Sequence, residues 1–129
     1  MGELTIETVD GKTRFEPGET VEMLVGWNLE VQPEAIEVRA AWKTAGMGTQ
    51  DMSVVRTERV DHPKAMDGRR LLLELPREPY SFSGKLISLV WFLDVVALPS
   101  GEGRHVEITI APGGREVVLD GASTGGGRA

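Results

Sequence analysis

The chain contains no cysteine, which excludes disulfide bonds and thiolate chemistry and fits a reducing compartment. Basic residues are also scarce, because 14 Lys and Arg face 20 Asp and Glu, for a formal net charge of -6. Nucleic acids and anionic membrane surfaces attract proteins through clustered cations. Neither is therefore an expected partner of this acidic chain.

A long hydrophobic run is missing as well, since Asp94 interrupts the longest apolar stretch and no membrane-spanning helix is predicted. Residues 1–7 have neither the basic nor the apolar segment of a signal peptide. We therefore expect a soluble, cytoplasmic protein without membrane insertion. Its 129 residues suit one domain over residues 1–120, followed by a flexible Gly-rich tail or linker remnant over residues 121–129.

Apolar residues recur at every second position through most of the chain, which is the pattern of half-buried strands. Turn-forming residues such as Pro17 and Gly18 separate these segments, and residues 61–68 read as a polar loop. No convincing amphipathic helix is present. The pattern predicts an all-β fold, a two-sheet antiparallel sandwich with seven to eight strands. The expected strands cover residues 4–6, 21–29, 36–42, 52–60, 71–75, 86–98, 106–110 and 115–119.

The segment 86–98 is apolar on both faces and should form the long central strand of the sandwich. Alternation sends Leu89, Trp91 and Leu93 into the core, and Trp27 and Trp42 also lie at inward positions. Asp94 interrupts the outward face, where a gatekeeper against aggregation is the first interpretation; an inter-sheet polar contact or an interface residue are the alternatives. The outward apolar residues are Leu86, Val90, Phe92 and Val96, with Leu24, Gly26 and Ala41 expected beside them.

Four motifs occur in order along the chain and together resemble the arrestin-like fold family. They are Phe-Glu-Pro-Gly-Glu-Thr-Val-Glu at residues 15–22 followed by Gly26, the alternating strand at 36–42, Leu-Leu-Leu-Glu-Leu-Pro at 71–76, and Pro-Tyr-Ser-Phe-Ser-Gly-Lys at 79–85 before the long strand. The nearest resemblance is to single-domain bacterial members, similar to sporulation-control proteins and retromer subunits. It implies an immunoglobulin/arrestin-like sandwich that binds proteins as a scaffold or adaptor. The basic phosphate-sensing cluster of eukaryotic arrestins has no counterpart here, so phosphoprotein recognition is not implied.

The outward apolar face of the long strand suggests where a protein partner binds, because such a face in a two-layer sandwich needs a cover. A loop or the C-terminal tail could equally cover it. Alternatives to the adaptor are a ligand- or carbohydrate-binding module that uses exposed aromatic rings, a self-associating subunit, and pairing at the edge strand 52–60, although Arg56, Glu58 and Arg59 disfavour edge pairing. The predicted interaction residues are Val90, Phe92, Val96, Tyr80 and Phe82.

Residues suited to catalysis or metal binding are few. His62 lies near Asp61 and Asp67 in the expected polar loop, but a solvated loop is the simpler interpretation because these ligands are too few for a typical site. His105 is out of phase with its apolar neighbours and should face outward. The sequence offers no nucleophile with a base and an orienting group. We therefore assign no catalytic, cofactor-binding or metal-binding residue and expect a protein that is not an enzyme.

Overall fold

The computed structural model describes residues 2–46, 50–84, 86–115 and 117–119, and these form an almost entirely β structure. All eight expected strands are present, and the short strands β2 and β7 are additional. Two 3-10 turns, η1 (Val9–Gly11) and η2 (Pro112–Gly114), complete the elements. The strands are β1 (Glu3–Thr8), β2 (Arg14–Phe15), β3 (Thr20–Asn28), β4 (Ala35–Gly46), β5 (Met52–Asp61), β6 (Met66–Glu74), β7 (Phe82–Gly84), β8 (Ile87–Leu98), β9 (Gly103–Ile110) and β10 (Val117–Leu119).

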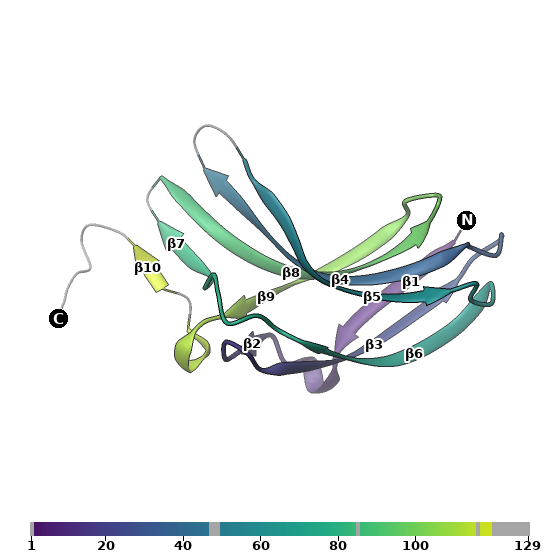
Figure 1. Cartoon of the computed structure of the whole chain (residues 1–129), viewed down its shortest axis with the longest axis horizontal. Helices are drawn as coiled ribbons and strands as arrows, with labels where there is room; N and C mark the ends of the chain where they lie inside the picture. Colours follow the sequence, from purple (N-terminus) through teal and green to yellow (C-terminus); the bar gives the residue numbers. More distant parts are fainter. Residues whose placement is uncertain (1, 47–49, 85, 116, 120–129) are drawn as a thin grey trace.

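Two sheets pack against each other, which confirms the predicted sandwich (Figure 1). The small sheet has the order β1-β3-β6, and the large sheet has the order β10-β7-β8-β4-β5. Strand β9 pairs with β8, and β2 pairs with β9. The pairing is antiparallel except for β2 with β9 and β10 with β7. Figure 1 shows that the end of β4, the start of β5, β7 and the start of β8 extend away from the small sheet.

The core lies between the two sheets, on the side of each strand that the sequence alternation predicts. Trp27 and Trp91 are buried, and the half-buried Trp42 packs against the same cluster. Each fully buried large apolar side chain contributes about 1.5–3 kcal/mol to folding. The other largest buried apolar side chains are Val21, Met23, Ile36, Val38, Leu75, Leu93, Val95 and Ile110.

The segment before β7, which carries the resemblance most specifically, joins three parts of the large sheet. The indole Nε1 of Trp91 donates a hydrogen bond of 2.8 Å to the carbonyl of Pro79. The buried Ser81 donates its backbone N–H to the carbonyl of Ile110 over 2.8 Å, and its Oγ accepts from the N–H of Ile110 over 3.0 Å. Since buried polar groups are costly without partners, these bonds fix the segment in place. The segment therefore connects β7 to β8 and to the end of β9.

A second pair of motifs meets at the turn between β2 and β3. The N–H of Gly18 donates to the carbonyl of Pro76 over 3.2 Å, and the N–H of Leu75 donates to the carbonyl of Glu19 over 2.9 Å. Gly18 has a φ of +81°, a conformation that glycine adopts without the penalty of a Cβ atom. The Pro-Gly-Glu turn and the Leu-Pro motif, far apart in sequence, therefore form one joint.

The predicted loop over residues 61–68 is wrong at both ends. Strand β5 runs to Asp61 and β6 begins at Met66, because β3 is long enough to pair with Asp67 and Gly68 despite their polar or small side chains. Residues 62–65 form the actual connection. The predicted tail at 121–129 and the domain boundary at 120 lie outside the described residues. Within the part of the chain that the structure describes, no helix has the length and apolar character needed to cross a membrane.

Candidate functional site

The outer face of the large sheet is ordered in rows, because directly paired residues on neighbouring strands point the same way. Phe92 on β8 pairs with Ala41 on β4 and with Glu107 on β9. Ala41 pairs in turn with Val54 on β5. The row therefore runs Val54, Ala41, Phe92 and Glu107 across four strands, and its centre is apolar.

The next row toward the hairpin tip is also largely apolar. Lys43 pairs with Val90 on one side and with Met52 on the other. The side chains of Met52 and Val54 are exposed by 66% and 43%, whereas Val90 and Phe92 are half-buried. Leu86, just before β8, is 67% exposed. We define the apolar patch as Ala41, Met52, Val54, Leu86, Val90 and Phe92.

Two cationic or ionisable side chains border the ring of Phe92. The ammonium group of Lys43 lies 5.7 Å from the ring centroid, within the range of a cation–π contact. The imidazole of His105 meets the ring edge-on, with centroids 6.0 Å apart and an interplanar angle of 72°. His105 is exposed on the outer face, as predicted. These contacts cover part of the Phe92 ring, while Val54 and Glu107 at the two ends of its row are exposed and Ala41 is buried.

Small side chains extend the patch toward β7 and β10. Ala45 on β4 pairs with Ser88 on β8, Ser88 pairs with Ser83 on β7, and Ser83 pairs with Val118 on β10. Val118 is 55% exposed. This row contains no charged side chain, so the sheet surface is uncharged along it.

The other half of the same outer face is held by ion pairs. Arg39 and Asp94 are direct cross-strand partners, and their two hydrogen bonds measure 3.0 and 2.9 Å. The hydrogen bonds that Arg39 donates to Asp94 raise the pKa of Arg39, while burial of the guanidinium opposes that shift. Arg59 bonds to Glu37 over 3.0 Å and to Asp61 over 2.7 Å. We call Glu37, Arg39, Arg59, Asp61 and Asp94 the charged half.

The role of Asp94 follows from this pairing. Its partner Arg39 belongs to the same sheet, so an inter-sheet contact is wrong. A bidentate carboxylate–guanidinium pair keeps both groups satisfied although Asp94 is only 14% exposed. The ion pair interrupts the apolar run of β8 on its outward side, which is compatible with a gatekeeper. That role stays a prediction.

The predicted interaction residues do not all share one surface. Val90 and Phe92 lie in the apolar patch, but Val96 is only 9% exposed and lies beyond the Asp94 row. Its neighbour across the strand pair is Gly103, where an added Cβ would lie 3.1 Å from Cγ2 of Val96. Tyr80 is exposed, whereas Phe82 is half-buried against the core and pairs with Leu89. Phe82 is thus placed as a core neighbour.

The expected neighbours of the face are partly wrong. Leu24 and Gly26 lie on β3 and belong to the small sheet, so Ala41 alone adjoins Phe92. Sequence reasoning missed Met52 and Val54. Their side is set by the irregular register between Ala40 and Ala41, where the pairing of β5 skips a residue. Alternation in sequence continues through such a bulge without marking it.

The carboxylates weighed as metal ligands in the polar loop form other interactions. Asp61 pairs with Arg59, and a carboxylate oxygen of Asp67 accepts the N–H of Gly68 over 2.8 Å. Within the described residues, no three His, Cys, Asp or Glu side chains gather as a metal site would require.

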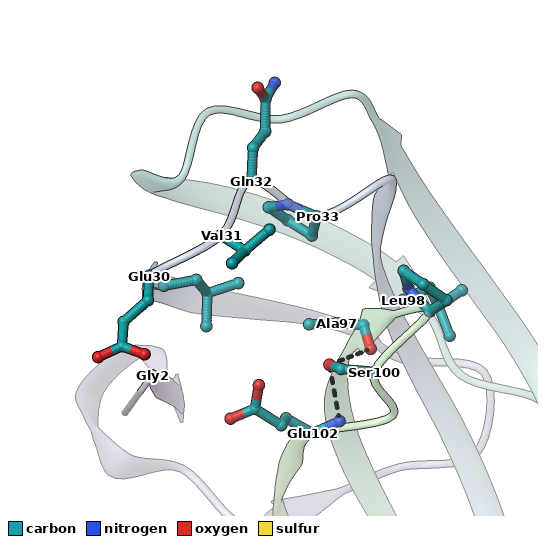
Figure 2. Close-up of a pocket in the computed structure, with 11 residues that line it drawn as sticks. Gly2, Glu30, Val31, Gln32, Pro33, Ala97, Leu98, Ser100 and Glu102 are labelled. Carbon is teal, nitrogen blue, oxygen red and sulfur yellow. Dashed lines mark hydrogen bonds between the residues drawn. The ribbon is translucent and has the colours of Figure 1, made fainter.

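A pocket of about 220 Å³ lies at the opposite end of the sandwich, between the β3–β4 connection and the β8–β9 turn. Figure 2 shows Val31 and Pro33 on one side of it and the carboxylates of Glu30 and Glu102 on another, with Gln32 pointing away. Ser100 braces the turn, since its Oγ donates to the carbonyl of Ala97 over 3.4 Å and accepts the N–H of Glu102 over 3.3 Å. No aromatic ring lines the pocket among the described residues.

Comparison with known proteins places the fold. No family model matches the chain, and no curated protein sequence matches it. Among solved structures, the crystal structure of Spo0M, a sporulation control protein from Bacillus subtilis, is similar with a TM-score of 0.60 at 14% sequence identity. The match covers 85% of this chain and 49% of Spo0M, so the chain spans about half the length of that protein. The arrestin-like fold that the four motifs indicated is thereby confirmed.

Proposed function

We propose that the chain is a non-enzymatic protein-interaction module, an adaptor or scaffold, which binds an apolar segment of a partner protein on the apolar patch. One observation carries the proposal. On the outer face of the described part of the large sheet, exposed apolar side chains lie within the patch at Met52 and Val54, and Leu86 lies just before β8. Val118 adds an exposed apolar side chain at the far edge of the same face. Monomeric proteins rarely expose a contiguous apolar surface without a use for it.

The chemistry of the patch favours a protein over a sugar or a nucleic acid. The single aromatic ring of the patch, Phe92, is half-buried between Lys43 and His105 and offers no open stacking platform. An apolar strip with Lys43 near its centre fits an extended or helical segment with apolar anchors. The resemblance to Spo0M, a sporulation control protein, supports a regulatory rather than a catalytic role. A chain without cysteine is compatible with the reducing cytoplasm, which we propose as its location.

The test is affinity purification of the tagged full chain from the lysate of its source organism, with three variants in parallel. Phe92→Asp and Val54→Asp place a charge in the patch, and Leu72→Asp places one on the exposed outer face of the small sheet as a matched control. Thermal unfolding checks that each variant folds. We expect a partner that wild type and Leu72→Asp retain and that both patch variants lose. Equal recovery by all four proteins would exclude the patch as the binding site.

A second copy of the chain is the alternative occupant of the patch, and light scattering can reveal it. Light scattering of the purified wild type gives its mass in solution, and a dimer that Val54→Asp dissociates would make a second copy the partner. Such a homodimer would contradict the proposed adaptor function and indicate a self-associating subunit.

The pocket in Figure 2 supports a second candidate, a small-ligand module. Its apolar walls and the carboxylate of Glu102 would suit a small amine with an aliphatic chain better than a sugar, because no ring lines the described walls. A small aliphatic amine that shifts the amide signals of Ala97 to Glu102 would favour this candidate. Capture of a protein partner without that signal would favour the adaptor.

A further inference from the structure

A second hollow, of about 450 Å³, lies on the same outer face as the apolar patch, where the sheet ends at β2. Arg14, Thr109, Gly114 and Arg115 line it. They come from three separate elements, because Arg14 belongs to β2, Thr109 to β9, and Gly114 and Arg115 to η2 and the residue after it. The hollow is therefore assembled by the fold and is not visible as a sequence motif.

Alternation explains why Arg14 and Thr109 face outward. The next residues, Phe15 and Ile110, are buried and paired with each other, so their neighbours Arg14 and Thr109, also paired, must point to the opposite side. Thr109 is two residues from Glu107 on the same strand, which places the hollow in line with the rows of the patch.

Turn η2 brings the second arginine back to this surface. Gly113 and Gly114 have φ values of +72° and +67°, so the chain reverses sharply after Ala111. Gly114 lies against β2, since an added Cβ would be 3.3 Å from Cβ of Arg14. Arg115 follows directly and lines the same hollow as Arg14.

The charges of the two arginines are not neutralised within the described residues, since neither forms an ion pair there. No Asp or Glu lines the hollow among the described residues. An Oε1 atom of Glu16 accepts the N–H of Gly113 over 3.1 Å, and Glu19 pairs with Lys12. Glu107 shares the face but forms no ion pair among the described residues. In a chain of net charge -6, two arginines that line one hollow without an ion pair among the described residues favour an anion there.

We infer that this hollow binds a carboxylate of the partner, so that the partner segment carries an Asp or Glu beside the apolar anchor seated on the patch. The inference rests on the proposed function. A guanidinium group matches a carboxylate in a planar, two-bond geometry, and the hydroxyl of Thr109 can add a third donor. Strand β2 lies two strands from β8, roughly 10 Å at about 4.8 Å per strand. Arg14 also lies two residues further along the strands than Phe92, about 7 Å, so the acid lies about 12 Å, or three to four extended residues, from the anchor.

The direct test is an NMR titration of the ¹⁵N-labelled full chain with capped tri-glutamate and tri-glutamine peptides, and with inorganic phosphate. We expect saturable shifts at the amides of Thr109, Gly113 and Gly114 with tri-glutamate only. The double variant R14Q/R115Q should weaken this binding by about tenfold, and R104Q, which removes a charge at the other end of β9, should not. Absence of shifts at these amides, or equal shifts with both peptides, overturns the inference. Tighter binding of phosphate than of tri-glutamate overturns the choice of a carboxylate.

The same variants separate this inference from the proposed function. If R14Q/R115Q loses the captured partner at low salt and R104Q keeps it, both proposals are supported. If R14Q/R115Q keeps the partner while Phe92→Asp loses it, the patch stands and the anion hollow is rejected. If no partner is captured but tri-glutamate still shifts the three amides in wild type only, the hollow stands without the patch.

Discussion

The outer face of the large sheet has two halves that differ although the same strands build both. Along β4 and β8, the pair Ala41 and Phe92 is followed two residues on by the pair Arg39 and Asp94. The charged half satisfies itself, because each carboxylate and guanidinium of the row has a partner within the sheet. The apolar patch has no such internal solution and leaves Met52 and Val54 exposed. We infer that the charged half serves folding and that the patch serves binding.

The largest effect on stability should come from breaking the charged half with Asp94→Ala. Arg39 would keep its charge in a partly covered position without its bidentate partner, and losing a charged hydrogen-bond partner costs about 1.5–3 kcal/mol. We expect the free energy of unfolding to fall by about 2 kcal/mol. Urea denaturation of the variant and the wild type measures this. A loss below that of Phe92→Ala would reverse the assignment of the two halves.

Truncation in the patch should cost less stability and more binding. Phe92 is half-buried, so Phe92→Ala removes only part of the contacts that a fully buried ring would lose, and we expect a loss of about 1 kcal/mol. Partner capture should fall well beyond what this small destabilisation explains. Retained capture together with a loss of 3 kcal/mol or more, the roughly core-like value, would show that Phe92 is a core residue.

Replacing the Arg39–Asp94 pair by apolar residues removes the difference between the two halves. In R39L/D94L both members of the pair are replaced, so no lone charge remains, and stability should change by less than about 1 kcal/mol. The exposed apolar surface would then extend from the patch across the Asp94 row. We expect concentration-dependent self-association by sedimentation, which the wild type would show less. A variant that remains monomeric at high concentration would argue that Asp94 has no protective role.

Much of this face could be read from the sequence, and the limits have physical causes. Alternation within 86–98 correctly assigned Trp91 inward and Phe92 outward, because side-chain direction is a local property of a strand. The strand beside Phe92 is set by pairing between distant segments, which alternation does not encode. The expectation that Leu24 adjoins Phe92 is therefore wrong, since Leu24 belongs to the small sheet. The Arg39–Asp94 pair joins residues 55 positions apart for the same reason.

The short strands mark a second limit. Strand β2 has two residues and β7 has three, too few for any alternation to register. They nonetheless position Arg14 beside Thr109 and Ser83 beside Ser88. The hollow with the two arginines therefore follows from long-range pairing and from the reversal at Gly113 and Gly114, neither of which composition reveals.

The ion pair of Lys12 with Glu19 lies outside this face and can be compared with the Arg39–Asp94 pair. Breaking it should have the smallest effect on stability. The bond from Lys12 and the backbone N–H of Glu16 hold the pKa of Glu19 below its usual value of 4.5, against a smaller opposing effect of burial. A carboxyl whose pKa is lower in the folded state stabilises the protein above pH 4.5, and that contribution disappears as the pH falls through the folded pKa.

Because the pair is largely exposed, we expect Glu19→Gln to lower the free energy of unfolding by less than about 0.5 kcal/mol at pH 7. Urea denaturation of both proteins between pH 7 and pH 3 should show the difference vanishing in acid. A pH-independent difference, or one as large as that of Asp94→Ala, would mean that a partly exposed ion pair here matches the covered Arg39–Asp94 pair and that the charged half has no special weight in folding.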